Sequence, residues 1–282
     1  MTSPSLDELR GQIDGIDDAL HDLLKRRAEL VDTIARAKGP SSVLALRTGR
    51  EAQVLRRLLS RHDGRFPATA LVRVWREIMG AFTFLQSPVR VVVCRPADQP
   101  GFWDLARDQF GGQIPFVAVE TTPQVIAAVR GDPSTIGVVP APVQDEPSPW
   151  WPRLMSGDPT TPNIIQRLPF VAMPNSRGRG LDAYVIARLE AEPSGEDRSL
   201  IAVETTSEIS RGRILDAIRK AGFPAPSNAL GADQGGQHAD LFEVPTFVGD
   251  GDPRLELARV ALAAENARVV SLGAYAVPPI LR

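Results

Sequence analysis

The chain has 282 residues, of which 43% are hydrophobic and 23% charged, values typical of soluble globular proteins with one to three domains. Its formal net charge of -2 argues against nucleic acid or an anionic membrane as a partner. Cys94 is the only cysteine, which excludes internal disulfides and favours a reducing, cytoplasmic location. The acidic N-terminus does not fit a signal peptide, and no apolar run reaches the roughly 20 residues of a membrane-spanning helix.

Residues 5–38 are predicted to form one long helix that begins with a capping box, Ser5 with Glu8, and ends before Gly39. Apolar residues recur along it every three or four positions, as on one helical face: Leu6, Leu9, Ile13, Ile16, Leu20, Leu23, Leu30 and Ile34. A helix of about 50 Å cannot bury this face against a small domain of its own. We therefore expect an intertwined homodimer in which a second copy covers it.

Arg27 lies within this apolar stripe, and Lys38 lies eleven residues further on, within about 20° of the same line. A cation buried among apolar side chains costs several kcal/mol unless an anion pairs with it. A single such cation more often reaches water along its own aliphatic stem. Two cations on one line favour a pocket for an anion.

Two shorter helices are predicted at residues 47–61 and 68–86. Glu51 projects toward the apolar side of the first, Arg50 lies on its flank, and Gln86 lies at the edge of the second. Arg10 lies roughly 100° from the centre of the long stripe, where it could reach a neighbouring protomer, although a lone exposed arginine is usually only solvated. The predicted inward face of the third helix is Leu71, Val74, Trp75, Ile78, Phe82 and Leu85.

The inward or flanking polar residues contain no histidine, no pair of nucleophile and base, and no metal-binding cluster. Arginines suit a ligand with two carboxylates because a guanidinium binds a carboxylate through two hydrogen bonds. A lysine and an amide can stabilise negative charge that develops on an oxygen, and a carboxylate can accept from a hydroxyl. The set is Arg10, Arg27, Lys38, Arg50, Glu51 and Gln86.

Residues 6–88 resemble the all-helical class of chorismate mutases. The segments that carry the resemblance are LDELRGQIDGIDDALHDLLKRRAELVDTIARAK, REAQVLRRL and WREIMGAFTFLQ. The resemblance implies the Claisen rearrangement of chorismate to prephenate, a step of aromatic amino acid biosynthesis that needs no cofactor or metal. Such a site holds the dianion in its reactive conformer and stabilises charge on the breaking ether oxygen.

By position, the resemblance implies that Arg27 and Arg50 bind the substrate carboxylates in one protomer and that Arg10 is contributed by the other. It implies that Lys38 and Gln86 donate to the ether oxygen and that Glu51 accepts from the ring hydroxyl. Two positions depart from the family. Arg47 stands where an aspartate is usual, and Phe82 where a small or hydroxyl residue is usual.

After residue 88 the pattern changes to strand, helix, strand, helix, strand, which predicts a parallel three-layer unit at residues 89–180. Residues 140–162 are expected to be a loop or linker, followed by one more strand at residues 164–173. This region weakly resembles the dehydratase part of bifunctional chorismate mutase–prephenate dehydratases. Arg95-Pro96-Ala97-Asp98 replaces that family's glycine-rich turn and its Thr-Arg catalytic motif does not appear, so we expect no dehydratase activity.

Residues 181–282 are predicted as a ferredoxin-like, ACT-like α+β unit, from a strand-helix-strand-strand-helix-strand order after Arg198. The predicted fold is thus multi-domain, α followed by α/β, with helices at 1–88, the α/β unit at 89–180 and the ACT-like unit at 181–282. An amino acid effector could bind the last unit, although the phenylalanine-binding signatures of the family do not appear.

Two functional hypotheses remain open. The first is an active chorismate mutase dimer with a degenerate C-terminal half. The second is a regulatory or amino-acid-sensing protein that uses the helices only to dimerise. An interface used only for dimerisation would not require a buried Arg27, which favours the chorismate mutase hypothesis. The changes at Arg47 and Phe82 keep the regulatory hypothesis open.

Overall fold

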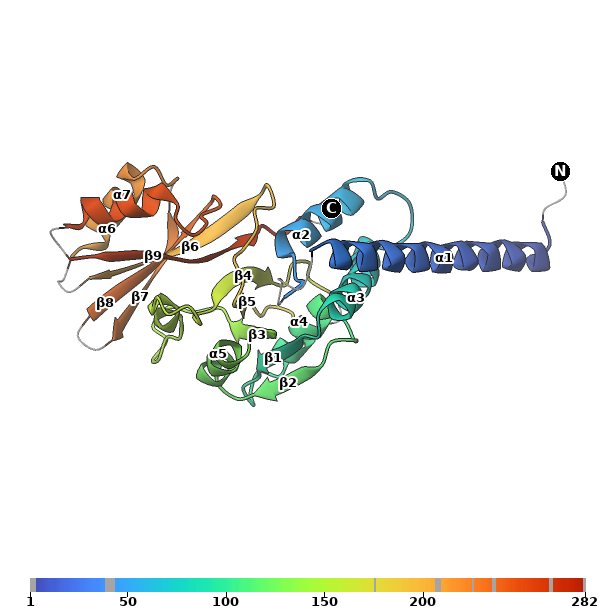
Figure 1. Ribbon diagram of the computed structural model, residues 1–282, viewed down its shortest axis with the longest axis horizontal. Helices are drawn as coiled ribbons and strands as arrows, with labels where there is room; N and C mark the ends of the chain where they lie inside the picture. Colours follow the sequence, from blue (N-terminus) through green and yellow to red (C-terminus); the bar gives the residue numbers. More distant parts are fainter. Residues whose placement is uncertain are drawn as a thin grey trace.

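The computed structural model describes residues 4–38, 44–174, 176–205, 209–224, 226–234, 237–263 and 266–280, and only the backbone of Lys38, Asn228, Ala229 and Gln234. A long helix projects from a body made of two short helices, an α/β region and a C-terminal α+β unit (Figure 1). This arrangement confirms the predicted fold class and order of regions. Among the described residues, no helix combines the length and apolar character that a membrane span requires.

Helix α1 (Leu6–Lys38) has the predicted capping box. The amide of Ser5 donates to Glu8 Oε2 (2.7 Å), and the amide of Glu8 donates to Ser5 Oγ (3.2 Å). Most of α1 extends away from the body (Figure 1). The eight residues of its apolar stripe are therefore between 40 and 72% exposed within this chain. Such a row of exposed leucine and isoleucine side chains is typical of a helix that packs against a partner.

Helices α2 (Thr48–Ser60) and α3 (Ala68–Gln86) begin and end within a residue of the predicted positions. The predicted inward face of α3 is wrong in part, because Val74 and Leu85 are exposed. The buried residues of α3 are instead Val72, Arg76, Met79, Gly80, Phe82 and Thr83. The helix is contacted from two sides, by α1 and α2 on one and by α4 (Gly101–Phe110) on the other, so a single apolar stripe does not describe it.

One nine-stranded sheet runs through the rest of the chain in the order β2-β1-β3-β5-β4-β9-β6-β8-β7. Its strands are β1 (Arg90–Cys94), β2 (Phe116–Val119), β3 (Thr135–Pro140), β4 (Asn163–Leu168), β5 (Ala183–Ala187), β6 (Asp197–Thr205), β7 (Ser227–Gln234), β8 (Gln237–Val244) and β9 (Arg268–Ala276). The strands β2, β1 and β3 are parallel, as predicted. Helices α4 and α5 (Thr122–Gly131) pack in separate hydrophobic clusters with alternate residues of β1 and β3, which places them on opposite faces.

Strand β5 was not predicted, and it makes the middle of the sheet antiparallel, since it pairs in that sense with both β3 and β4. The boundary predicted at residue 180 lies between β4 and β5, two strands that pair. Between the halves of the sheet, β4 pairs with β9 where Ile164 faces Gly273. Gly273 has a φ of +122°, and a Cβ there would overlap the Ile164 carbonyl, so glycine permits this junction.

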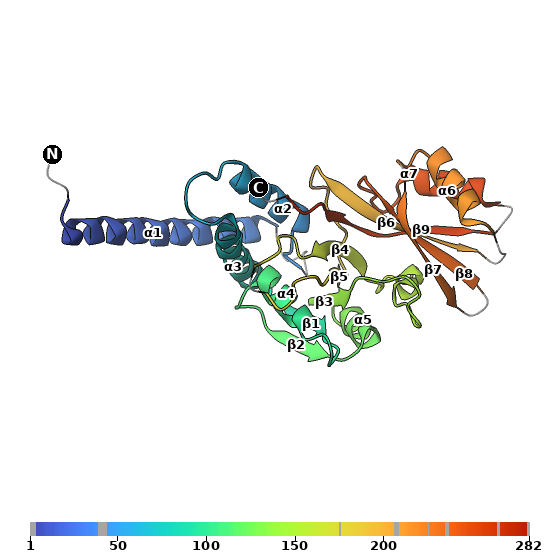
Figure 2. The same cartoon turned by 180° about the vertical axis from the view of Figure 1, so that it is seen from behind.

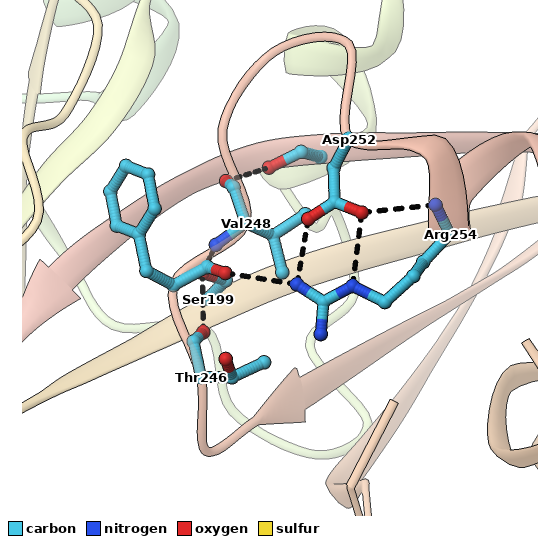
Figure 3. A network of polar contacts seen from close by, with 7 residues as sticks. Ser199, Thr246, Val248, Asp252 and Arg254 are labelled. Atoms are coloured by element: carbon cyan, nitrogen blue, oxygen red, sulfur yellow. Dashed lines mark hydrogen bonds and ion pairs between the residues drawn. The ribbon is translucent and has the colours of Figure 1, made fainter. Parts of the chain in front are cut away.

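The C-terminal unit has the predicted ferredoxin-like order, with helices α6 (Arg211–Lys220) and α7 (Pro253–Ala261) packed on β6, β8 and β9. A polar network fixes the loop before α7 (Figure 3). Ser199 Oγ donates to the Thr246 carbonyl (2.9 Å) and accepts from the Val248 amide (2.8 Å). Asp252 caps α7 by accepting from the Arg254 amide and also pairs with the Arg254 guanidinium (2.6 Å).

Helix α2 is docked to the C-terminal half of the chain through Arg56. Its guanidinium donates to the Ser194 carbonyl and hydroxyl (3.2 and 3.0 Å) and to the carbonyls of Glu196 (2.9 Å) and Val277 (2.7 Å). The chain after β9 thereby returns to lie beside α2 (Figure 2). A charged donor that satisfies several carbonyls at once holds a helix in a defined orientation.

Candidate active site on the N-terminal helices

The facing sides of α1, α2 and α3 enclose a cavity of about 640 Å³. Its walls are mostly apolar and include Leu20, Leu23, Val54, Trp75 and Ile78. Cationic and polar groups project among them, namely Arg27, Arg47, Arg50, Glu51, Arg57, Thr83 and Gln86. An apolar pocket with a few polar groups that converge is the usual form of a small-molecule site.

Arg27 reaches this cavity from α1, as the stripe predicted. Its side chain is half-buried, and Cζ lies 4.8 Å from the centre of the Phe82 ring. Burial lowers the pKa of Arg27, and the nearby Glu51 carboxylate partly opposes this. A guanidinium remains charged at neutral pH even so. Arg27 therefore presents a partly desolvated cation, which attracts a carboxylate more strongly than an exposed one does.

Glu51 points into the same cavity from α2 and is 13% exposed. Its Oε2 accepts a hydrogen bond from Arg76 Nη1 of α3 at 2.7 Å. Burial raises the pKa of Glu51, while Arg76 and, less strongly, Arg27 lower it. The carboxylate is thus held between one cation at the pocket and another beneath it.

Arg50 and Gln86 also line the cavity. Arg50 is exposed, and its Nη1 lies 3.4 Å from Gln53 Oε1 of the same helix. Gln86 is half-buried and donates from Nε2 to the Phe82 carbonyl at 3.0 Å. An amide has a second hydrogen on the same nitrogen, so this contact leaves Gln86 able to donate to a ligand.

Of the two remaining predicted residues, Arg10 does not line this cavity, and the side chain of Lys38 is not described. Arg10 lies on the projecting part of α1, where it is exposed and pairs with Asp7 at 3.1 Å. Lys38 ends α1, and its side chain lies outside the described residues. The structure therefore brings together Arg27, Arg50, Glu51 and Gln86 within one chain.

The two unusual positions both border the cavity. Arg47 pairs with Glu192 at 2.5 Å, so a residue of the C-terminal half holds it at the rim. Phe82 stacks against Arg27. Sequence reasoning missed Arg57 at the wall and Arg76 beneath Glu51. Arg76 could have been found from its spacing with Val72 and Met79, four and three residues away, which are also buried.

A second cavity, of about 1080 Å³, lies between the α/β region and the C-terminal unit. On its wall Arg167 pairs with Asp182 (3.1 Å), and the Tyr275 hydroxyl donates to Glu243 (2.5 Å), which also pairs with Arg198. Burial raises the pKa of Tyr275, so its hydroxyl stays protonated. These groups therefore pair with one another at the cavity wall. Within the described part of the chain, no three His, Cys, Asp or Glu residues are grouped to hold a metal.

The helical region matches the family model Chorismate mutase type II over residues 9–87.

The chain is similar to curated bifunctional chorismate mutase/prephenate dehydratases. It is 30% identical to that of Aquifex aeolicus over 139 residues, and 29% identical to that of Stutzerimonas stutzeri over 140. Each match covers 48% of this chain but only 38% of the relative. A prephenate dehydratase structure from Streptococcus mutans aligns with 68% of this chain at 14% identity and a TM-score of 0.46, and covers 100% of that chain.

Proposed function

We propose that this protein is a chorismate mutase that converts chorismate to prephenate. The observation that carries the proposal is the single cavity that gathers Arg27, Arg50, Glu51 and Gln86 from three helices. The reaction is an intramolecular rearrangement, so the protein needs no nucleophile and no proton transfer. It must hold a dianion in a compact conformer and stabilise charge on the ether oxygen.

Each residue has a proposed role. Arg27 and Arg50 bind carboxylates, since guanidinium groups form charge-assisted pairs with them. Gln86, together with Lys38, donates to the ether oxygen. Glu51 accepts from the ring hydroxyl. The apolar walls exclude water, which strengthens these electrostatic contacts.

The site is completed by a second copy of the chain in this proposal. Arg10 is too far along the projecting helix to line its own cavity, and it is exposed there. An α1–α1 dimer would cover the apolar stripe and carry the partner's Arg10 toward the cavity. The homodimer is supported by the exposure of the whole stripe.

We also propose that the chain lacks prephenate dehydratase activity. Among the described residues, the wall of the second cavity has four carboxylates, Glu120, Glu146, Asp182 and Glu243, against two guanidiniums, Arg153 and Arg167. Although Arg198 pairs with Glu243, the excess of carboxylates does not favour binding of a dianionic substrate. Arg167 is in addition already paired with Asp182.

We make three further proposals about the chain as a whole. The chain divides at residues 88 and 180 into helical, α/β and ACT-like parts, with the sheet continuous across the second boundary. An amino acid effector binds the ACT-like part. The protein works in the cytoplasm, which its one buried, unpaired cysteine supports.

The proposal is tested with the purified full-length protein and chorismate. Chromatography should show loss of chorismate and formation of prephenate, and phenylpyruvate only after acid treatment. Arg27→Met should lower kcat/KM about 100-fold, the effect of losing one charge-assisted carboxylate contact. Arg26→Met is the matched control, since Arg26 is the exposed neighbour on the same helix. Absence of chorismate loss at micromolar protein would refute the mutase and leave the regulatory alternative. Phenylpyruvate without acid would refute the second proposal.

A further inference from the structure

Arg76 is a fully buried cation that the proposed chemistry does not use. Its side chain is only 2% exposed. One nitrogen, Nη1, donates to Glu51, whereas Nη2 is buried without a hydrogen-bond partner among the described residues. Burying a guanidinium is costly, and an unsatisfied donor adds to that cost. A residue kept in such a position calls for a reason other than stability.

Stability of the fold does not by itself explain the buried ion pair of Arg76 with Glu51. A buried ion pair replaced by apolar residues of similar volume is often no less stable. The surroundings of Arg76 are apolar enough for such a replacement, because Ala52, Val72, Met79 and Phe170 form one hydrophobic cluster there. The pair of Arg76 with Glu51 is therefore better explained by what it does to Glu51.

On its other side Arg76 is covered by the C-terminal half of the chain. Its Cζ lies 5.1 Å from the centre of the Phe170 ring, in the segment that follows β4. Phe170 is itself buried. Arg76 is thus fixed between a carboxylate at the floor of the mutase cavity and an aromatic ring of the α/β region.

We infer that Arg76 is a positioning residue of the mutase site, which holds the Glu51 carboxylate ionised and correctly aimed, and that Phe170 holds Arg76 in place. The inference rests on the proposed mutase function. It assigns the α/β region a role in that function, since this region supplies the support beneath the pocket. Removal of Arg76 should impair the use of Glu51 while leaving Arg27 and Arg50 in place.

The direction of the effect follows from the charges around Glu51. Arg27 faces it from α1 and Arg76 from α3, Arg47 and Arg50 are its neighbours on α2, and Phe170 brings no charge. Burial already raises the pKa of Glu51, and Arg76 is the strongest group that opposes this. Without the guanidinium the pKa rises further. A larger fraction of Glu51 is then protonated at neutral pH and accepts a hydrogen bond less strongly.

The test compares Arg76→Met with Arg76→Lys and with Arg73→Met, an exposed arginine on the same helix. We expect Arg76→Met to lower kcat/KM at neutral pH about 10-fold or more, mainly through KM, and to shift the acidic limb of the pH profile to higher pH. Arg76→Lys, which keeps the charge, should restore the position of that limb. Arg73→Met should behave as the wild type.

The same substitution in a Glu51→Gln variant separates an effect on Glu51 from a loss of folding. In Glu51→Gln, which has no carboxylate to position, adding Arg76→Met should change kcat/KM by less than about 2-fold, because the two effects are not independent. Additive losses in this double variant would overturn the inference, as would an active wild type that Arg76→Met leaves unaltered. A wild type that does not consume chorismate would instead refute the mutase function itself. If Arg76→Met fails to fold, the double variant and Arg76→Lys still decide the outcome.

Discussion

Leu30→Ala should weaken the dimer without affecting the fold of the chain. Leu30 belongs to the apolar stripe of α1 and is 59% exposed in the single chain. Full burial of a leucine contributes about 1.5–3 kcal/mol, so covering the exposed part contributes about 1–2 kcal/mol per protomer. A symmetric dimer has two copies of the contact. The substitution should therefore cost about 2–4 kcal/mol of association free energy, which is about 30- to 1000-fold in Kd.

The assay is sedimentation over a range of protein concentrations. Leu257→Ala is the matched control, since Leu257 lies on α7 and is 56% exposed but belongs to no such stripe. We expect Leu257→Ala to associate as the wild type does. A wild type that stays monomeric at tens of micromolar, or equal shifts in both variants, would refute the reasoning from α1.

Two further predictions concern stability. Arg56→Met removes the four hydrogen bonds that dock α2 and should lower the free energy of unfolding in urea by about 3 kcal/mol. The control Arg61→Met changes an exposed arginine and should lower it by less than about 0.5 kcal/mol. Equal effects of the two substitutions would contradict this docking role. Asp252→Ala removes the cap of α7 and its pair with Arg254 and should cost about 1–2 kcal/mol at pH 7. The Arg254 side chain holds the pKa of Asp252 below its usual range, so this contribution is present above the unfolded pKa, about 3.9, and is lost as the pH falls through the lower folded value. A stability difference from the wild type that persists unchanged at pH 2 would contradict it.

The local features of the helical region could be predicted from sequence because they depend on near neighbours. The spacing along residues 6–34 fixed both the helix and the inward position of Arg27, and Ser5 with Glu8 fixed its start. The polar set of the cavity followed from which helical face each residue occupies. The roles of all six predicted site residues stay predictions: Arg10, Arg27, Lys38, Arg50, Glu51 and Gln86.

Features that depend on distant contacts were missed. Arg76 is covered by Phe170, which follows it by more than ninety residues, so its burial depends on a contact distant in sequence. Strand β5 is five residues long and wholly buried, so it has no alternation of polar and apolar residues that would mark it. Its antiparallel pairing with β3 and β4 is set by the fold and not by its own sequence.

The central claim, a mutase site shared between two chains, is tested most directly by subunit complementation. Arg10→Ala and Arg27→Ala variants, each nearly inactive toward chorismate, are mixed, dissociated and reassociated in equal amounts. Half of the dimers should be mixed, and each mixed dimer should have one site without either substitution, so about a quarter of the wild-type activity should return. No recovery above the separate variants, with mixed dimers present, would contradict a site built from both protomers.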